Sequence, residues 1–228
     1  RALNTFILSL SSLIFTWIFV IPLGVVAALN RNKFIDRILS FTSYIGISMP
    51  TFFLAFIFLY LATFTGWLPL GGMRSIRFDE FSLWGKVFDL GRHLIIPTIV
   101  LSIGSICVLQ RIMRANLLEV LGSSYILGAK ARGLSNRRIL YIHALKNALN
   151  PMITIFGYQF SSLLSGAALV EIIIGWPGLG MVTLEAVRSQ DLYLVMGSVL
   201  VGGAFLIIGN LVADILLAYF DARIRYEK

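Results

Sequence analysis

The chain has 228 residues, of which 58% are hydrophobic and only 13% are charged, with a formal net charge of +8. An average soluble domain carries about a quarter charged residues, so this composition excludes an ordinary soluble fold and indicates a membrane-embedded protein. The single cysteine, Cys107, excludes an internal disulfide and a cysteine-based metal site. The only histidines, His93 and His143, are expected at opposite membrane faces, so no metal site is predicted.

Five uncharged stretches follow along the chain, on the scale of the roughly 20 apolar residues with which a helix crosses a bilayer. They are residues 2–30, 38–73, 93–110, 147–170 and 192–213, the third continuing towards Leu118 and the last past Asp214 to Phe220. The stretches are apolar on all sides, whereas barrel strands would be about ten residues long and would alternate apolar with polar. The sequence therefore predicts an all-α polytopic membrane protein in which residues 1–228 form a single transmembrane domain.

The first stretch begins after Arg1 rather than after a methionine. It is too long for a signal peptide and lacks a small-residue cleavage site. We therefore expect the chain to be a fragment or a processed product from which an N-terminal helix is missing.

The basic residues are divided unequally between the predicted loops. If the loop after the first stretch is cytoplasmic, most of the 19 lysines and arginines lie on that side, while acids balance the rest on the other side. This is the positive-inside pattern, which places residue 1 outside and residue 228 in the cytoplasm. A membrane topology thus accounts for the basic excess, and no nucleic-acid partner is expected.

The segment of about 111–146, between the third and fourth stretches, is predicted to form two short helices. Ser123 and Ser124 can cap the first, at 125–132. Gly133 is placed to take the left-handed conformation at the end of this helix, with Leu134 as the hydrophobic residue of the cap.

Ser135 is placed to cap the second short helix, at 136–148. Arg137 and Arg138 lie in its first turn, where a positive charge opposes the helix dipole by roughly 0.3–1 kcal/mol each. Either anionic lipid headgroups or an acidic groove on a partner protein must favour them, and the residues alone leave both open.

This segment resembles the cytoplasmic EAA loop of ABC-transporter permeases. Residues 125–135 read Tyr-Ile-Leu-Gly-Ala-Lys-Ala-Arg-Gly-Leu-Ser, and residues 139–151 read Ile-Leu-Tyr-Ile-His-Ala-Leu-Lys-Asn-Ala-Leu-Asn-Pro. The general pattern is Glu-Ala-Ala, three residues, then Gly; here two of the three positions depart, because Leu127, Gly128 and Ala129 stand there.

The oligopeptide, dipeptide and nickel branch of that family carries an Ala-Arg-Ala-Lys-Gly-Leu type of core instead. Four further motifs are similar to this branch and lie in the same order: Ser-Met-Pro-Thr-Phe-Phe at 48–53, Gly-Trp-Leu-Pro-Leu-Gly-Gly at 66–72, His-Leu-Ile-Ile-Pro at 93–97 and Glu-Ile-Ile-Ile-Gly-Trp-Pro-Gly-Leu-Gly at 171–180. The resemblance spans nearly the whole chain.

The resemblance implies the transmembrane domain of a type I ABC importer, with five transmembrane helices present of an expected six. It implies a multi-pass protein of a prokaryotic cytoplasmic (inner) membrane, working with a second homologous permease as a heterodimer, two cytoplasmic ATP-binding subunits and an extracytoplasmic solute-binding protein. The sequence contains no Gly-x-x-x-x-Gly-Lys-Ser/Thr phosphate loop. We therefore expect no enzyme activity and no cofactor in this chain, with ATP and Mg²⁺ held by the partner subunits.

In the family, the loop is the coupling helix that receives the motion of the ATPase subunits. The residues carried over to this role are Tyr125, Leu127, Gly128, Ala129, Ala131, Gly133, Leu134, Arg137 and Arg138. The small residues Gly128, Ala129 and Ala131 would allow close approach to the partner, or alternatively pack against the ends of the chain's own helices. Glu171, Trp176, Pro177, Gly178 and Gly180 are implied to form an external gate region where the binding protein docks.

Polar and small residues mark a candidate translocation pathway. Gln159, Ser162 and Gly166 share one face of the fourth predicted helix, and Ser43 and Pro50 have a similar place on the second. Such residues either line a route for solute or mediate tight helix packing. Asp214 in the last stretch is expected to pair with a basic residue of the inner loops.

The function implied is a permease that forms the pathway for di- or oligopeptides and couples it to ATP hydrolysis elsewhere. Nickel and sugars are alternative cargoes, and no residue of this sequence decides among them. A secondary transporter or channel would need more intramembrane charge than Asp214 supplies. An intramembrane enzyme would need a histidine or aspartate motif that the sequence lacks.

Overall fold

The computed structural model describes the backbone of residues 1–220. It describes their side chains except at positions 154, 157–158, 160–166, 213–214 and 216–220. Predictions for the side chains of Ser162 and Asp214, and for the surroundings of Gly166, therefore lie outside the described residues. Every regular element in the described chain is helical, as the uncharged stretches predict.

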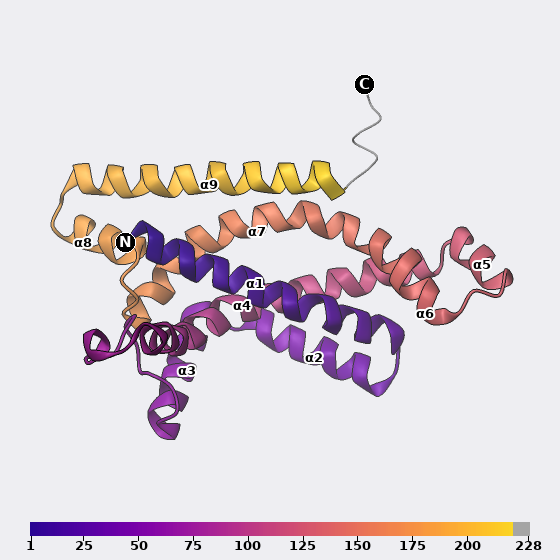
Figure 1. Cartoon of the computed structure of the whole chain (residues 1–228), viewed down its shortest axis with the longest axis horizontal. Helices are drawn as coiled ribbons and strands as arrows, with labels where there is room; N and C mark the ends of the chain where they lie inside the picture. Colours follow the sequence, from indigo (N-terminus) through magenta and orange to yellow (C-terminus); the bar gives the residue numbers. More distant parts are fainter. Residues whose placement is uncertain (221–228) are drawn as a thin grey trace.

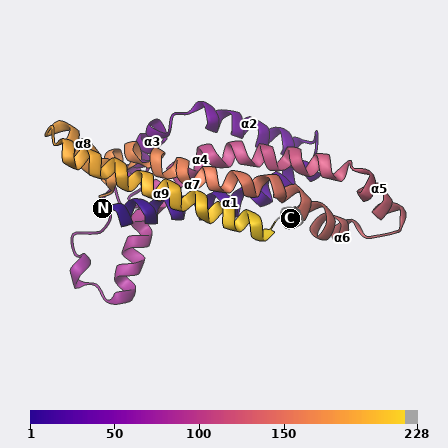
Figure 2. The same cartoon turned by 90° about the horizontal axis from the view of Figure 1, so that it is seen from above.

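The longer helices form a bundle of elongated shape (Figure 1). They are α1 (Ala2–Leu29), α2 (Phe34–Ser48), α3 (Thr51–Thr65), α4 (Leu83–Leu121), α7 (Leu145–Ile174), α8 (Leu179–Arg188) and α9 (Leu192–Phe220). Shorter pieces are η1 (Phe78–Glu80), α5 (Ser124–Ala131), α6 (Asn136–Arg138) and the π-helical η2 (Ile139–Ala144). Both views place α5 and α6 at one end of the molecule and α8 at the other (Figures 1 and 2); we call these the α5 end and the α8 end.

Among the residues whose side chains are described, three helices are long and apolar enough to cross a membrane, and counting two bent pairs raises the number to five. The single helices are α1, α4 and α9, the last over its residues 192–212. The bent pairs are α2 with α3, at 104°, and residues 167–174 of α7 with α8, at 82°. Candidate spans thus coincide with the first, second, third and fifth predicted stretches, and the bent pair at 167–188 overlaps the fourth stretch only at its end.

The second predicted stretch is broken at Pro50. Proline lacks a backbone N–H and clashes with the preceding helical turn, and it forces the residue before it into an extended conformation. Met49 accordingly has φ −89° and ψ 123°, and Pro50 has φ −60° and ψ 140°. The stretch without charge therefore folds as two helices that differ in direction, rather than as one.

Two buried apolar clusters form the core, one towards each end of the molecule. Leu8 and Leu13 of α1 belong to the cluster at the α8 end. Val20 and Ala28 of the same helix belong to the cluster at the α5 end. Helix α1 contributes to both clusters and packs along α4. The α1–α4 pair therefore lies at the centre of the helix packing.

Close helix contacts depend on glycine. A Cβ atom at Gly24 of α1 would lie 2.6 Å from Cβ of Met113 on α4, and one at Gly46 of α2 would lie 2.4 Å from Sγ of Cys107. Both distances are below van der Waals contact, so only glycine fits there. Small residues at such crossings are typical of membrane helices, because dispersion contacts rather than water exclusion hold these helices together.

Polar bonds also join α2 to α4. Arg114 of α4 donates from Nε to Oδ1 of Asp36 at 2.6 Å and from Nη2 to Oδ2 at 2.7 Å. Asp36 also accepts the backbone N–H of Asn32 at 2.8 Å. One turn away, Gln110 of α4 donates from Nε2 to Oγ of buried Ser43 at 2.8 Å. The start of α2 is thus fixed to α4 by a two-pronged ion pair.

The variant Asp36→Asn is expected to lower the stability of the purified protein by roughly 1.5–3 kcal/mol, the range for hydrogen bonds to charged groups. The amide keeps the shape of the carboxylate but can accept only one of the two bonds from Arg114. Thermal unfolding in detergent, followed by tryptophan fluorescence, measures the change. Asp79→Asn is the matched control, because Asp79 is exposed and makes no ion pair among the described residues; equal midpoints for both variants would contradict the expectation.

Candidate functional site

The turn after α5 has the geometry that the sequence predicts. Gly133 has φ +79°. Its N–H donates to the carbonyl of Lys130 at 2.9 Å, and the N–H of Leu134 donates to the carbonyl of Ala129 at 3.3 Å. This pair of bonds is a Schellman motif, in which the left-handed residue is glycine because it has no Cβ to clash. The chain therefore reverses sharply at Gly133.

The caps on either side of this turn differ from each other. Oγ of Ser135 accepts the N–H of Arg138 at 3.4 Å, which confirms the predicted cap of the second helix. Ser123 occupies the N-cap position of α5, but its hydroxyl donates to the carbonyl of Val120 at 2.6 Å and caps nothing in α5. The start of α5 is thus linked back to the last turn of α4.

The second short helix does not end near residue 148, contrary to the sequence prediction. It begins as α6, passes through the π-helical η2 and continues without a break into α7. The N–H of Leu145 bonds to the carbonyl of Leu140, five residues back, which is the π pattern. Residues 139–144 contain neither glycine nor proline, so nothing in them ends the helix. The basic turn and the fourth predicted span are therefore one helical rod.

One face of α5 is buried against the chain's own helices. Ile126 is 0% exposed and Ala129 is 3% exposed, in the cluster that also contains Met113 and Leu117 of α4 and Ile139 of η2. For Ala129 this burial corrects the expectation that its side chain faces a partner protein, and agrees with the alternative of packing inside the chain. The exposed residues of the predicted set are Tyr125, Leu127, Gly128, Ala131, Gly133, Arg137 and Arg138, with Leu134 half-buried.

A buried polar cluster forms where α7, α8 and α1 meet. The side chain of Glu171 is 0% exposed. It accepts Oγ1–H of Thr5 at 2.6 Å and the backbone N–H of Gly180 at 2.7 Å. Thr5 in turn accepts the N–H of Leu179 at 2.8 Å. The first N–H groups of α8 are thus capped by side chains from two other helices, and the carboxyl group of Glu171 lies at the positive end of the α8 dipole.

The turn between α7 and α8 has no space for a side chain at two of its glycines. A Cβ at Gly178 would lie 2.1 Å from Oε1 of Glu171, and one at Gly180 would lie 2.5 Å from Cα of Ala168. Trp176 is fully buried and donates from Nε1 to the carbonyl of Asn4 at 3.1 Å. The turn is therefore interlocked with the start of α1.

Burial limits which residues of the turn between α7 and α8 can contact another protein. Glu171, Trp176, Gly178 and Gly180 are buried, and only Pro177 is half-exposed, so in this conformation the first four are not available to contact a docked protein. Thr5 and Asn4, which hold the turn, were missed in the sequence. They lie more than 160 residues away along the chain, and nothing near them signals that contact. A role in an external gate stays a prediction.

The candidate pathway residues have different neighbours. Oε1 of Gln159 accepts Nε1–H of Trp17 at 3.0 Å, and the Trp17 ring packs edge-on against Phe156 with centroids 5.4 Å apart. Ser43 is instead buried against α4, where it serves helix packing, and Pro50 is exposed at the break between α2 and α3. Gln159 therefore joins α7 to α1, while Ser43 joins α2 to α4.

An apolar groove of about 560 Å³ borders the Trp17 contact. Its walls are one face of α1, including Leu10, Ile14 and Ile18, together with Phe156 of α7. The groove and the Trp17–Gln159 bond put exposed apolar surface and one buried amide next to each other, about midway along α1.

Gly178→Ala is expected to destabilise the protein by about 3 kcal/mol or more, because the added methyl group must displace a buried carboxylate from its hydrogen bonds. Thermal unfolding in detergent gives the size of the effect. Gly203→Ala on α9 is the matched control, since a Cβ there meets nothing within 4 Å, and alanine favours a helix over glycine by up to about 1 kcal/mol. Similar midpoints for the two variants would contradict the crowding at Gly178.

The chain is similar to a known protein family and to several of its members. Residues 20–226 match the family described as binding-protein-dependent transport system inner membrane component. The chain is 38% identical over 227 residues to the oligopeptide transport system permease protein AppB of Bacillus subtilis (strain 168), covering 99% of this chain and 70% of that protein. It is 37% identical to the di/tripeptide transport system permease protein DppB of Pseudomonas aeruginosa (strain UCBPP-PA14), covering 97% of this chain and 70% of that protein.

The fold also resembles a solved structure. The match is to a chain of the inward-facing MetNI methionine ABC transporter, with a TM-score of 0.74 and 15% identity, covering 96% of this chain and 93% of that one. At this identity the likeness concerns the fold alone, and it confirms the ABC importer type I transmembrane fold. Because the family match covers most of the sequence, as does the identity to the permeases, the chain belongs to the binding-protein-dependent transport system inner membrane component family.

Proposed function

We propose that this chain is the permease subunit of an ATP-driven importer of di- or oligopeptides, and that segment 123–138 receives the motion of cytoplasmic ATPase subunits. The observation that carries the proposal is the packing of α5 within this segment. One face of this short helix is buried against the bundle, and its other face is exposed at the α5 end (Figure 1). The remaining partners would be a second permease and an extracytoplasmic binding protein. ATP and Mg²⁺ would be bound by the ATPase subunits and not by this chain.

The exposed face of α5 has the chemistry of a protein contact. Leu127 is 56% exposed and Tyr125 is 46% exposed. Gly128, the residue after Leu127, has open space where a Cβ would point. A small residue beside exposed apolar side chains permits the close approach of a shaped groove on a protein. The basic residues Lys130, Arg132, Arg137 and Arg138 surround this face and would meet acids on the rim of that groove.

Peptide cargo rests on the relatives. AppB and the DppB proteins are named as oligopeptide, di/tripeptide and dipeptide permeases, and they align with nearly all of this chain. Nickel and sugars, the alternative cargoes, have no support among these names. The apolar groove beside Trp17 and Gln159 suits a peptide, which combines apolar side chains with amide groups that need hydrogen bonds.

A self-powered secondary transporter is the second candidate, because it would use titratable groups inside the membrane. Three buried acids lie in helices of the candidate spans, namely Asp36, Asp89 and Glu171, although the sequence pointed only to Asp214. Asp36 accepts bonds from a guanidinium group, Asp89 from a serine, and Glu171 from a threonine and a backbone N–H. Acids already engaged in this way favour an external source of energy.

Gly133→Val is expected to abolish peptide uptake while leaving the protein in the membrane. Valine at φ +79° is strained by roughly 1–3 kcal/mol, so the turn must open and α5 must change direction. Uptake of labelled peptide by cells and the amount of membrane-inserted protein measure the two effects. Gly133→Asn is the matched control, because asparagine tolerates the left-handed conformation, and should retain most of the uptake; full uptake by the valine variant would count against the proposal.

The double charge reversal Arg137→Glu/Arg138→Glu is expected to reduce co-purification of the ATPase subunits at least tenfold. Both side chains are exposed, so the fold should tolerate the change, and the thermal midpoint of the isolated permease should stay within a few degrees. Affinity purification of the complex from membranes measures the partnership. Unchanged recovery of the ATPase subunits would place the docking surface elsewhere.

A further inference from the structure

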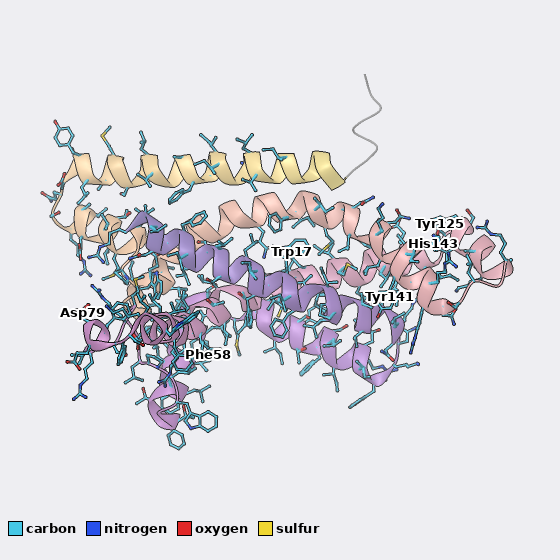
Figure 3. All side chains as sticks on the ribbon, viewed as in Figure 1. Trp17, Phe58, Asp79, Tyr125, Tyr141 and His143 are labelled. Atoms are coloured by element: carbon cyan, nitrogen blue, oxygen red, sulfur yellow. The ribbon has the colours of Figure 1, made fainter. Side chains whose placement is uncertain are left out.

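A hydrogen bond crosses from the coupling helix to the rod that follows it. Nδ2 of Asn147, in the first turn of α7, donates to the phenolic oxygen of Tyr125 in α5 at 2.7 Å. The same amide nitrogen donates to the carbonyl of His143, one turn earlier, at 3.0 Å. Figure 3 shows Tyr125 beside His143, with Tyr141 away from them. Both hydrogens of the amide are therefore used, one to orient the side chain on its own helix and one to hold α5.

This bond closes a triangle. α5 and the rod that starts at Asn136 are two arms that meet at the Gly133 turn, and the bond between Tyr125 and Asn147 joins the arms away from that apex. Apart from this bond, α5 is held by the apex, by the link from Ser123 to Val120 of α4, and by Ile126 and Ala129 in the apolar cluster. Apolar contacts are not directional, so they permit α5 to pivot about Gly133. A directional bond across the open side of the triangle opposes that pivot.

The rod is the element through which a movement would enter the bundle. From Asn136 it runs through η2 and α7 as far as Ile174, past Gln159 and on to Glu171. Nearer its start, Asn116 of α4 donates to the carbonyl of Ala148 at 3.4 Å. An α5 that moves as one body with this rod would displace α7, whereas an α5 that pivots would absorb the motion locally.

We propose that Tyr125 and Asn147 are positioning residues whose hydrogen bond makes α5 and α7 move as one body. The proposal rests on the proposed function of segment 123–138. It gives the hydroxyl of Tyr125 a role inside the chain, whereas the exposed edge of its ring stays free for the partner. The bond transmits motion and is not needed for the ATPase subunits to dock.

The test uses the complete transporter reconstituted in lipid nanodiscs, with Cys107→Ser in the permease and spin labels at Ser124→Cys and Leu169→Cys. Both labelled positions are exposed, one on α5 and one on α7. Double electron–electron resonance gives the distribution of distances between the labels, without nucleotide and with ATP and vanadate. The variants are Tyr125→Phe, Asn147→Leu and their combination. Tyr141→Phe is the matched control, because Tyr141 lies on the same rod and is exposed.

The labelled protein and the Tyr141→Phe control should show one narrow distribution that keeps its centre when ATP and vanadate are added. Tyr125→Phe and Asn147→Leu should each broaden it at least twofold, and the combined variant should be no broader than either, because both changes remove the same bond. Recovery of the ATPase subunits with the Asn147→Leu permease should be unchanged, because Asn147 is not part of the docking face. Unaltered widths, additive broadening, or loss of the ATPase subunits in Asn147→Leu would each overturn the proposal.

The measurement separates this inference from the proposed function. Label distances do not depend on which solute is carried, so an error in the cargo leaves the test intact. If the charge reversal at Arg137 and Arg138 retains the ATPase subunits, the docking surface is wrong whatever the label distances show. If that reversal releases them but Tyr125→Phe leaves the distribution narrow, docking stands and the role of the bond fails.

Discussion

A backbone N–H or C=O group that is buried away from water costs free energy unless it is paired, so the groups in a buried helix break must find partners within the protein. The break between α7 and α8 meets this demand with groups from distant parts of the chain. Glu171 and Thr5 accept the first N–H groups of α8, and the carbonyl of Ile174 accepts the N–H of Gly72 at 2.8 Å. The need to pair the backbone thus explains why an acid is fully buried there.

Signals that act over a few residues were sufficient to predict much of the fold. Uncharged runs located α1, α4 and α9, while the orientation that the charge distribution predicts stays a prediction. Gly133 and Ser135 were assigned their turn and cap correctly because a left-handed residue and an N-cap depend only on neighbours three to five positions away. The family resemblance rested on motifs of the same short range, and these survived in register along most of the chain.

The sequence did not predict the directions of the helices or the contacts between residues far apart in the chain. Hydropathy measures how apolar a stretch is and not where it points, so the 104° bend at Pro50 was hidden inside one uncharged run. The π segment has no breaking residue to reveal it. Glu171 beside a glycine-rich turn is typical of an exposed loop, and its burial depends on Thr5, 166 positions away. The inward face of Ala129 likewise depends on helices that the local pattern does not contain.

Different interactions stabilise the helix packing at the α8 end and at the α5 end. This difference affects which end can move. At the α8 end, buried side chains hold α1, α7 and α8 together by hydrogen bonds, so any separation would leave several polar groups without partners. At the α5 end, α5 is attached by two apolar side chains, a glycine turn, the Ser123 link to α4 and one phenol–amide bond. Apolar contacts can slide at little cost, whereas buried polar bonds cannot. The α5 end is therefore the one built to be displaced, and the rod from Asn136 to Ile174 connects it directly to the end that resists.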